Sequence, residues 1–307
     1  MIDILLATYN GEKYISEQIE SILCQTYQNF RILIRDDGSS DNTVKIIKKY
    51  VDEYPQKIVF IEDDKKGGSA AKNFFHLINY ANSDYVMFCD QDDYWLSDKV
   101  EVTYKSMLKL EKRNSKNTPI LVFASYKAVD SKLNPINIKE KNNQIAKYKL
   151  DFSHLLVQNY VTGCLMMCNK ALYSNCGEYD DKILMHDWWL ALLASCLGVV
   201  YHVPKKVMYY RQHGNNEVGA VDVKSLKYRI GKFLDKKTKK MQYLYLSQAQ
   251  LFYKRYKKII GNETTSQLEH FISIYNEPLK VKRQYQLIKG HYLKSDIVRI
   301  VGQLWYV

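Results

Sequence analysis

The chain of 307 residues is poor in the residues that cross-link or interrupt a backbone, with 6 Cys, 5 Pro and 13 Gly. No Cys-x-x-Cys pair is present, and no Cys and His residues have the spacing of a zinc site. We therefore expect reduced thiols in a cytosolic protein rather than a disulfide framework. Apolar residues make up 46% and charged residues 25% of the chain, values that exclude a disordered or collagen-like protein.

A secretory leader and a membrane-spanning run are also lacking in the sequence. Residues 1–7 carry no basic side chain and are too short for the apolar core of a signal peptide. The longest apolar run, residues 188–203, is interrupted by Ser195, Gly198 and His202, and a spanning helix needs ~20 apolar residues. This run therefore predicts a buried helix followed by a buried strand.

The net charge of +12 lies entirely in the last quarter of the chain. Residues 224–307 contain 18 Lys and Arg against 5 Asp and Glu, a net charge of +13, and residues 1–223 have 27 against 28, a net of −1. This asymmetry indicates two regions with different partners. An anionic membrane surface and a nucleic acid are the two partners that so basic a region suits.

Short apolar runs alternate with helical patterns over the first hundred residues. The segments between the runs carry apolar residues at helical spacing, and the runs themselves have strand character at residues 2–7, 30–34, 58–61 and 85–89. Strands separated by helices predict right-handed βαβ units and hence an α/β protein with a mostly parallel sheet. Later strands are expected at residues 120–129, at 161–168, and as a pair at 198–203 and 207–210 with a turn at Pro204-Lys205.

From residue 223 onward the sequence is basic and helical in pattern, and no internal repeat is present. We therefore expect two domains. A catalytic domain would cover residues 1–222, and a basic α-helical region would cover residues 223–307.

Acidic and polar clusters follow three of the predicted strands, at residues 7–12, 36–41 and 90–93. The carboxyl ends of parallel strands meet at one edge of a sheet, so these clusters should converge. Carboxylates this close repel one another unless a cation neutralises them, and Mg²⁺ typically binds one or two carboxylates and completes its shell from phosphate oxygens. The pattern therefore predicts a divalent cation and a phosphate-bearing ligand, although the second cluster alone is equally an ordinary turn and helix cap.

Several motifs in order along the chain resemble family 2 glycosyltransferases of the GT-A fold. They are Ala7-Thr8-Tyr9-Asn10, Asp36-Asp37-Gly38-Ser39, Asp90-x-Asp92 and His186-Asp187-Trp188-Trp189. Together with residues 90–95 and 210–216, the last motif is most similar to the bacterial rhamnosyltransferase branch. The resemblance covers roughly residues 1–215. It implies a Rossmann-like, mostly parallel sheet flanked by helices, with the basic helical region following it.

The resemblance implies how the nucleotide is bound. Ala7, Tyr9 and Glu12 would line it, and Asp37 would accept a hydrogen bond from its pyrimidine base. Lys72, near the start of the predicted helix after residues 67–69, is a further candidate for the nucleotide site. Its alternative is a place on a solvated helix face.

The resemblance also implies a metal site and a base. Asp92 would ligate Mg²⁺ or Mn²⁺ bridging the diphosphate, with Asp90 contributing near the ribose, and Asp187 corresponds to the general base of inverting members. Two departures from the family pattern matter. His186 stands where many members have Glu, and the Gln-x-x-Arg-Trp signature of processive members is absent. We therefore expect transfer of a single sugar rather than polymerisation.

The chemistry of sugar transfer independently calls for the same groups. The charge that develops on the leaving diphosphate needs stabilising, which a metal does as a Lewis acid. The acceptor hydroxyl loses its proton during attack, and a carboxylate within hydrogen-bond reach can accept it. Asp187 directly precedes the apolar residues 188–193, so its alternative role is a helix N-cap, and it can serve both purposes.

Five further residues have a functional and a structural alternative. Trp188 and Trp189 would form a platform for the acceptor sugar, or belong to the core. Gly163 would lie on the acceptor side, or within a buried strand. Arg211 and His213 would contact the diphosphate or the metal, or lie in a surface loop.

These observations predict an inverting, non-processive glycosyltransferase. It would move one sugar, rhamnose by the resemblance, from a nucleotide-diphosphate sugar to a hydroxyl of a glycan or lipid-linked acceptor in cell-surface polysaccharide synthesis. Two alternatives stay open. A sugar-phosphate nucleotidyltransferase usually has a Gly-rich basic loop where this chain has residues 8–12, and a nucleic-acid-binding protein acting through the basic tail leaves the acidic clusters unexplained.

The basic tail combines charged clusters with aromatic and aliphatic residues. Helices of this kind suit the membrane interface, where each Lys or Arg near an anionic surface contributes ~1 kcal/mol. We therefore expect a cytoplasmic protein held at the inner face of the cell membrane, with no nucleic acid partner. The alternative is that the helices pack on the catalytic domain or form a homodimer contact.

Overall fold

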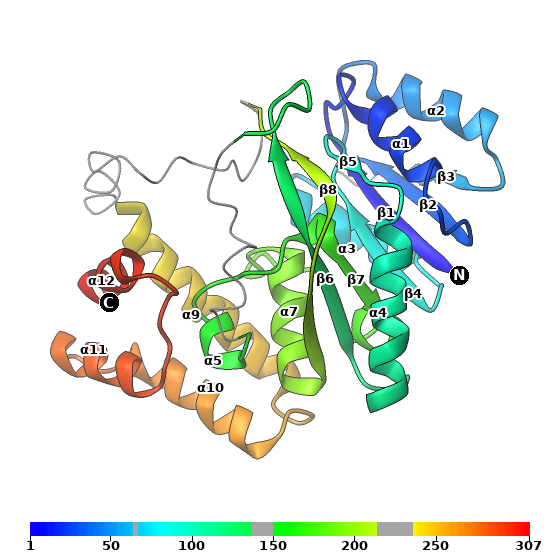
Figure 1. The fold of residues 1–307 in the computed structure, drawn as a ribbon. Helices are drawn as coiled ribbons and strands as arrows, with labels where there is room; N and C mark the ends of the chain where they lie inside the picture. Colours follow the sequence, from blue (N-terminus) through cyan, green and yellow to red (C-terminus); the bar gives the residue numbers. More distant parts are fainter. Residues whose placement is uncertain (64–66, 137–149, 214–235) are drawn as a thin grey trace.

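The computed structural model describes residues 1–63, 67–136, 150–213 and 236–307. Its eight-stranded sheet has the order β3-β2-β1-β4-β7-β6-β8-β5 (Figure 1). The pairs β1–β2, β1–β4, β2–β3 and β6–β8 are parallel, and β4–β7, β6–β7 and β5–β8 are antiparallel. The strands are β1 (Ile2–Thr8), β2 (Phe30–Asp36), β3 (Ile58–Phe60), β4 (Tyr85–Cys89), β5 (Tyr94–Trp95), β6 (Ile120–Val129), β7 (Met166–Asn169) and β8 (Val199–Arg211). The expected mostly parallel sheet is therefore confirmed, and its antiparallel pairs make it a mixed one.

Helices cover both faces of this sheet because its strands alternate their apolar side chains between two cores. In β1, Ile4 and Leu6 pack in the same core as α1, α2 and α4, whereas Leu5 packs in the core that contains α3 and α7. The helices of this part are α1 (Ile15–Leu23), α2 (Thr43–Glu53), α3 (Ala70–Tyr80), α4 (Lys99–Asn114), α5 (Phe152–Leu155), α6 (Lys170–Tyr173) and α7 (His186–Leu197).

The apolar run that predicted a buried helix and a strand forms α7 and the start of β8. Two neighbouring expectations are wrong in detail. Residues 198–210 do not turn back at Pro204-Lys205, because β8 continues beside β6 and its register skips these two residues as a bulge. Pro is tolerated there since a bulged residue is left out of the ladder. The strand expected at 161–168 is short, because residues Gly163–Leu165 form a 3₁₀ turn before β7.

The C-terminal helices pack against α7 and extend its core. They are α9 (Lys236–Tyr256), α10 (Asn262–Ile274), α11 (Lys280–Lys289) and α12 (Ile297–Tyr306). The centroid of the Trp189 ring in α7 lies 5.3 Å from the ring centroid of Phe252 and 5.8 Å from that of Tyr256, both in α9. The structure thus confirms the alternative that these helices pack on the part of the chain that forms the sheet. The expected domain boundary between residues 222 and 223 lies outside the described residues. Among the described residues, no helix has the length and hydropathy that a membrane span requires.

Candidate active site

The loops after β1, β2 and β4 are joined by side-chain hydrogen bonds at the carboxyl edge of the sheet. The amide of Gln91 pairs with the backbone of Tyr9 at both of its ends, accepting from the N–H at 2.9 Å and donating to the carbonyl at 2.8 Å. Asn10 accepts from the backbone N–H of Ser40 at 2.8 Å. The three polar clusters therefore converge as expected.

Gly11 makes the contact between the first and third loops sterically feasible. A Cβ at this position would lie 2.2 Å from the side-chain oxygen of Gln91. The sequence contained a signal for this bridge, an amide flanked by carboxylates in Asp90-Gln91-Asp92, but we assigned it no role. Gln91 is thus a site residue that sequence reasoning missed.

The residues expected around the nucleotide lie along this edge. Tyr9 has 57% of its surface exposed, so its ring is free to contact a ligand, and Ala7, at the end of β1, is half-buried. The carboxylate of Glu12 accepts from the backbone N–H of Asn42 at 2.9 Å and from its side-chain amide at 2.8 Å. Glu12 therefore also fixes the start of α2. Lys72 is half-buried in the first turn of α3.

Asp37 is held by a buried arginine and by a glycine backbone. Its carboxylate accepts from the N–H groups of Gly67 and Gly68, the latter at 2.8 Å, and lies 3.6 Å from the guanidinium of Arg35. Arg35 is fully buried and forms an ion pair with Asp63 at 2.7 Å. A Cβ on Gly67 would lie 2.6 Å from the Asp37 carboxylate. The N–H donors that Asp37 binds here are of the kind that a base edge offers.

The third cluster brings Asp92 and His213 together. The carboxylate of Asp92 lies 2.8 Å from Nε2 of His213, and the His213 ring stacks on Tyr14 with 5.0 Å between centroids. His213 comes from the end of β8, more than a hundred residues along the chain. The fold therefore assembles this pair from segments that the sequence keeps apart.

Arg211 does not lie in a surface loop. It is buried and binds the third cluster. Its Nε donates to the carbonyl of Asp92 at 2.8 Å, and its backbone N–H donates to the carboxylate of Asp93 at 3.1 Å. The guanidinium also pairs with Glu17 and lies 4.5 Å from the centroid of the Tyr14 ring. Since only 2% of Arg211 is exposed, these contacts replace the water it loses.

The donor atoms at this edge fit an oxygen-preferring cation. Ligand atoms of Asp90, Asp93 and Cys164 all lie within 4.8 Å of one another. Burial raises the pKa of the Cys164 thiol well above its ordinary value, so this group is protonated and a poor ligand for a hard ion. Asp90 and Asp92 supply carboxylates and His213 an imidazole, donors that suit Mg²⁺ or Mn²⁺.

Lys99 lies beneath this cluster and was not expected from the sequence. It is fully buried, donates to the carbonyl of Cys164 at 2.6 Å and lies 3.5 Å from the centroid of the Trp95 ring. Burial lowers the pKa of Lys99 to about 8, although the carboxylates of Asp93 and Asp90 favour its charged form. Its charge partly offsets theirs from within the core.

Asp187 lies near the start of α7, with 9% of its surface exposed. It is not the N-cap, because Met185 occupies that position. One carboxylate oxygen accepts from the side-chain amide of Asn159 at 3.0 Å, and the other accepts from the backbone N–H of Gly163 at 3.0 Å. The structure thus places Gly163 against the expected base. Asn159 carried no sequence signal and was missed.

The two tryptophans after Asp187 lie in the core, which corrects the expectation of an acceptor platform. Trp189 is completely buried and donates from its indole N–H to the carbonyl of Cys176 at 2.9 Å. Trp188 is nine-tenths buried and donates to the carbonyl of Leu155 at 2.6 Å. Packing of α9 over α7 covers both rings, so the sequence could not distinguish them from exposed aromatics.

His186 is a neutral residue in an aromatic pocket. Its ring lies 4.0 Å from that of Phe74 and 5.0 Å from that of Phe88, and neither ring nitrogen has a hydrogen-bond partner in the described part of the chain. Burial lowers the pKa of His186 to about 3. A Cβ on Gly163 would lie 2.6 Å from Nε2 of this ring, so Gly163 must be small.

Comparison with known proteins identifies relatives of this chain. The model of the family described as glycosyl transferase family 2 matches residues 3–175. The dTDP-rhamnosyl transferase RfbG of Shigella flexneri is 32% identical over 239 residues, 74% of this chain and 78% of that protein. An uncharacterized glycosyltransferase of Rickettsia typhi is 27% identical over 215 residues, 69% of this chain and 64% of that one.

Two solved structures resemble the fold at low sequence identity. S. aureus TarS 1–349 in complex with UDP-GlcNAc has a TM-score of 0.53 at 16% identity and covers 99% of this chain and 89% of that one. The mannosyltransferase PcManGT of Pyrobaculum calidifontis, in complex with GDP-Man and Mn²⁺, has a TM-score of 0.51 at 13% identity, with coverages of 99% and 87%. These likenesses confirm the GT-A fold that the sequence motifs implied.

The buried neutral His186 should make stability depend on pH. The folded-state pKa of about 3 lies below the ordinary 6.5, so the unfolded chain binds the extra proton and stability falls as pH drops below 6.5. When the pH falls from 7 to 5, the free energy of unfolding of wild type should drop by about 2 kcal/mol more than that of His186→Leu. Urea unfolding of both proteins at the two pH values measures this difference. Equal losses would show that His186 takes up its proton in the folded state.

Proposed function

The chain belongs to glycosyl transferase family 2, and from that premise we propose an inverting transfer of a single sugar. The donor would be a nucleotide-diphosphate sugar, with rhamnose as the transferred group, and the acceptor a hydroxyl of a glycan or lipid-linked molecule in cell-surface polysaccharide synthesis. The observation that carries this proposal is the convergence of the loops after β1, β2 and β4, with Asp92 beside His213. The dTDP-rhamnosyl transferase relative supports rhamnose.

In this proposal the nucleotide lies along the carboxyl edge of the sheet. The exposed ring of Tyr9 would stack on the base, with Ala7 beneath it. Asp37 would exchange its contact with the Gly67 and Gly68 N–H groups for one with the base edge. This exchange is inexpensive because the donors on either side are alike.

The diphosphate would lie at the third cluster. Asp90, Asp92 and His213 would hold a Mg²⁺ or Mn²⁺ ion, which when bound supplies positive charge to the leaving diphosphate. Arg211 fixes the backbone of Asp92 and therefore the direction of its carboxylate. Lys72, in the first turn of α3, would pair with a phosphate.

Asp187 would act as the general base. The acceptor oxygen attacks the anomeric carbon, the bond from that carbon to the diphosphate oxygen breaks, and the hydroxyl proton passes to the Asp187 carboxylate. Asn159 and the Gly163 N–H donate to this carboxylate, which holds its orientation. Attack from the face opposite the diphosphate inverts the anomeric centre.

Removing the charge of Asp187 should slow sugar transfer and leave donor binding unchanged. We expect Asp187→Asn to slow transfer by ~10²-fold or more, because an amide cannot accept the acceptor proton. Donor binding, followed by thermal shift with nucleotide diphosphate, should stay near wild type. Asp181→Asn, which changes an exposed carboxylate nearby, is the matched control. If the Asp187 variant turned over at the wild-type rate, the base would lie elsewhere.

The metal proposal predicts a loss of ion-dependent donor binding. Wild-type protein should gain thermal stability from nucleoside diphosphate only when Mg²⁺ or Mn²⁺ is present. Asp92→Ala should abolish that gain, whereas Asp52→Ala, which removes an exposed carboxylate from α2, should keep it. Full transferase activity of the wild type in excess chelator would contradict the proposal.

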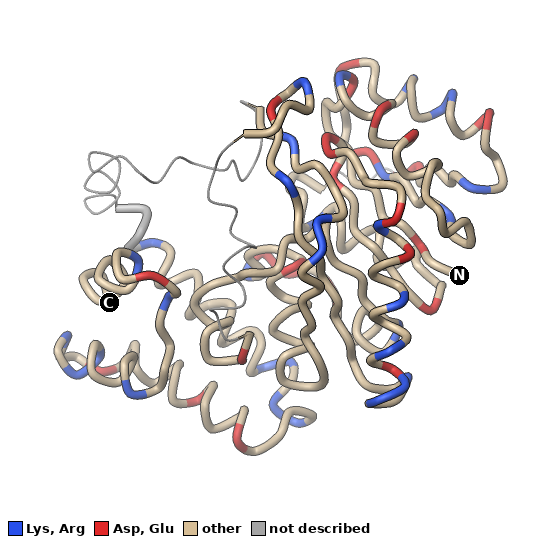
Figure 2. The backbone as a smooth tube through the Cα atoms, viewed as in Figure 1, with Lys and Arg blue, Asp and Glu red and all other residues tan. Residues whose placement is uncertain are grey.

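We also propose that α11 and α12 contact an anionic membrane surface. Gln284 of α11 donates to the carbonyl of Leu304 at 2.8 Å, and Lys280 lies 5.0 Å from the centroid of the Trp305 ring, so the two helices form one surface. Basic residues predominate over acidic ones along these helices (Figure 2). Large apolar side chains are exposed on them, at Val281, Ile288, Ile297, Val301 and Trp305. Apolar contact flanked by Lys and Arg suits an interface rich in acidic lipid.

This surface predicts specific vesicle binding. Wild-type protein should co-sediment with vesicles containing phosphatidylserine at low salt and bind phosphatidylcholine vesicles weakly. The pair Ile297→Ser and Trp305→Ser should weaken binding about tenfold, because both side chains are more than half exposed and lose apolar burial. The pair Val59→Ser and Tyr201→Ser, exposed on β3 and β8, is the control. If both pairs weakened vesicle binding equally, α11 and α12 would not be the membrane-binding surface.

A further inference from the structure

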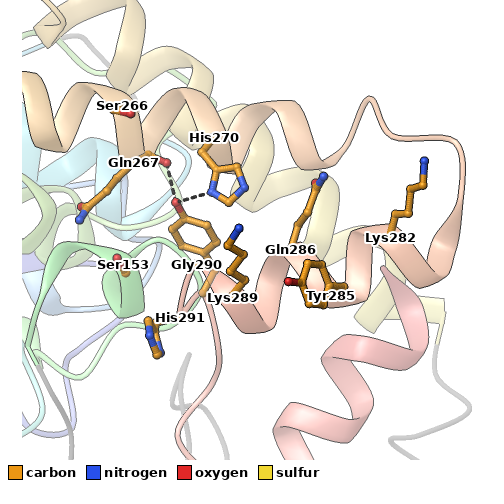
Figure 3. Close-up of a pocket in the computed structure, with 11 residues that line it drawn as sticks. Ser153, Ser266, Gln267, His270, Lys282, Tyr285, Gln286, Lys289, Gly290 and His291 are labelled. Carbon is orange, nitrogen blue, oxygen red and sulfur yellow. Dashed lines mark hydrogen bonds between the residues drawn. The ribbon is translucent and has the colours of Figure 1, made fainter.

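A groove between α10 and α11 lies outside the candidate active site. It encloses about 720 Å³ and is lined on one side by Gln267 and His270 of α10. On the other side lie Lys282, Tyr285 and residues further along α11 (Figure 3). Ser153 of α5 contributes to the lining at one end (Figure 3). The groove is of the size that small-molecule and oligosaccharide ligands occupy.

The groove carries positive charge, and none of its described lining residues is acidic. Lys282 and Lys289 are exposed lining residues, no Asp or Glu lines the groove, and neither lysine has an ion pair among residues 1–63, 67–136, 150–213 and 236–307. The two lysines are seven positions apart, about 10.5 Å along the helix, and point to different parts of the groove (Figure 3). This separation favours an extended anion over a single small one.

The remaining lining groups suit hydroxyls and sugar rings. The side-chain oxygen of Gln286 is buried and has no partner in the described residues, so it can accept from a ligand hydroxyl. Tyr285, between the lysines, has 62% of its surface exposed. The hydroxyl of Tyr292 is fixed by donation to the Gln267 carbonyl at 2.7 Å, and lies 3.3 Å from the His270 ring. One wall is therefore already ordered.

We propose that this groove binds an acidic saccharide, a sugar chain that carries carboxylate or phosphate groups. Lys282 and Lys289 bind successive acidic groups, Tyr285 packs on a sugar ring between them, and Gln286 accepts from a hydroxyl. A membrane surface fits less well, because the lining is formed by amides, hydroxyls and imidazoles rather than by apolar side chains.

The groove is connected to the expected base by a short stretch of chain. Ser153 belongs to α5, whose Leu155 carbonyl accepts from Trp188, the neighbour of Asp187. Four residues after Leu155, Asn159 donates to the Asp187 carboxylate. Resting on the proposed transferase function, we assign the bound saccharide as the acceptor chain, with its growing end directed toward Asp187.

Binding without any donor tests the groove independently of catalysis. Isothermal calorimetry of the full chain would use oligogalacturonate as the acidic saccharide and a dextran oligomer of equal length as the neutral one. Wild-type protein should bind the first and not the second. Replacing both lysines, Lys282→Ala with Lys289→Ala, should weaken binding about tenfold without lowering the thermal midpoint, since both side chains are exposed.

A matched pair of substitutions controls for net charge. Lys109→Ala with Lys112→Ala removes two exposed lysines from α4, on the other side of the sheet, and should leave oligogalacturonate binding unchanged. Tyr285→Ala should also weaken it, and Tyr285→Phe should restore it. Equal losses in the two lysine pairs would overturn the proposal. So would a wild-type protein that does not bind oligogalacturonate but needs Lys282 and Lys289 to bind a single-stranded oligonucleotide or phosphatidylserine vesicles. Failure of sugar transfer with groove binding intact would instead refute the transferase function.

Discussion

The buried guanidinium of Arg211 constrains the candidate site more than any other group. An arginine out of water is costly unless its donors are satisfied, and here the partners come from three separate segments of the chain. Its contacts to the carbonyls of Asp92 and Ser131 and to the carboxylate of Glu17 join the end of β8 to the loop after β4, the turn after β6 and α1. If one of these partners moved away, part of the buried Arg211 charge would be left unpaired. The loop of residues 90–93 therefore keeps one geometry. The position of His213 beside Asp92 follows from it.

A buried arginine also lies beside Asp37, where we propose that the base of the nucleotide binds. Arg35, fully buried, pairs with Asp63 and approaches the Asp37 carboxylate at 3.6 Å. In both places a carboxylate expected to meet ligand is oriented by an arginine that no ligand can reach. Asp187 is held differently, by the neutral donors Asn159 and Gly163.

The sheet and the convergence of its polar loops were predictable, because short apolar runs and βαβ order are local signals. Family membership was predictable from the order of the motifs, and it favours sugar transfer over the nucleotidyltransferase alternative. Burial decided by distant segments was not predictable. Trp189 is in the core only because α9 covers it, and Arg211 is buried only because α1 and the acidic loop close over it. The continuous β8 was missed because Pro204 is a turn signal that a bulge can also accommodate.

The central claim is that Asp187 deprotonates an acceptor that attacks from the face opposite the leaving diphosphate. The most direct measurement is the anomeric configuration of the product made from dTDP-β-L-rhamnose and an isolated cell-surface glycan acceptor, read by NMR from the anomeric C–H coupling. The account predicts an α-linked rhamnose, inverted relative to the donor. A β-linked product would contradict it, because retention requires a different arrangement of the reacting groups.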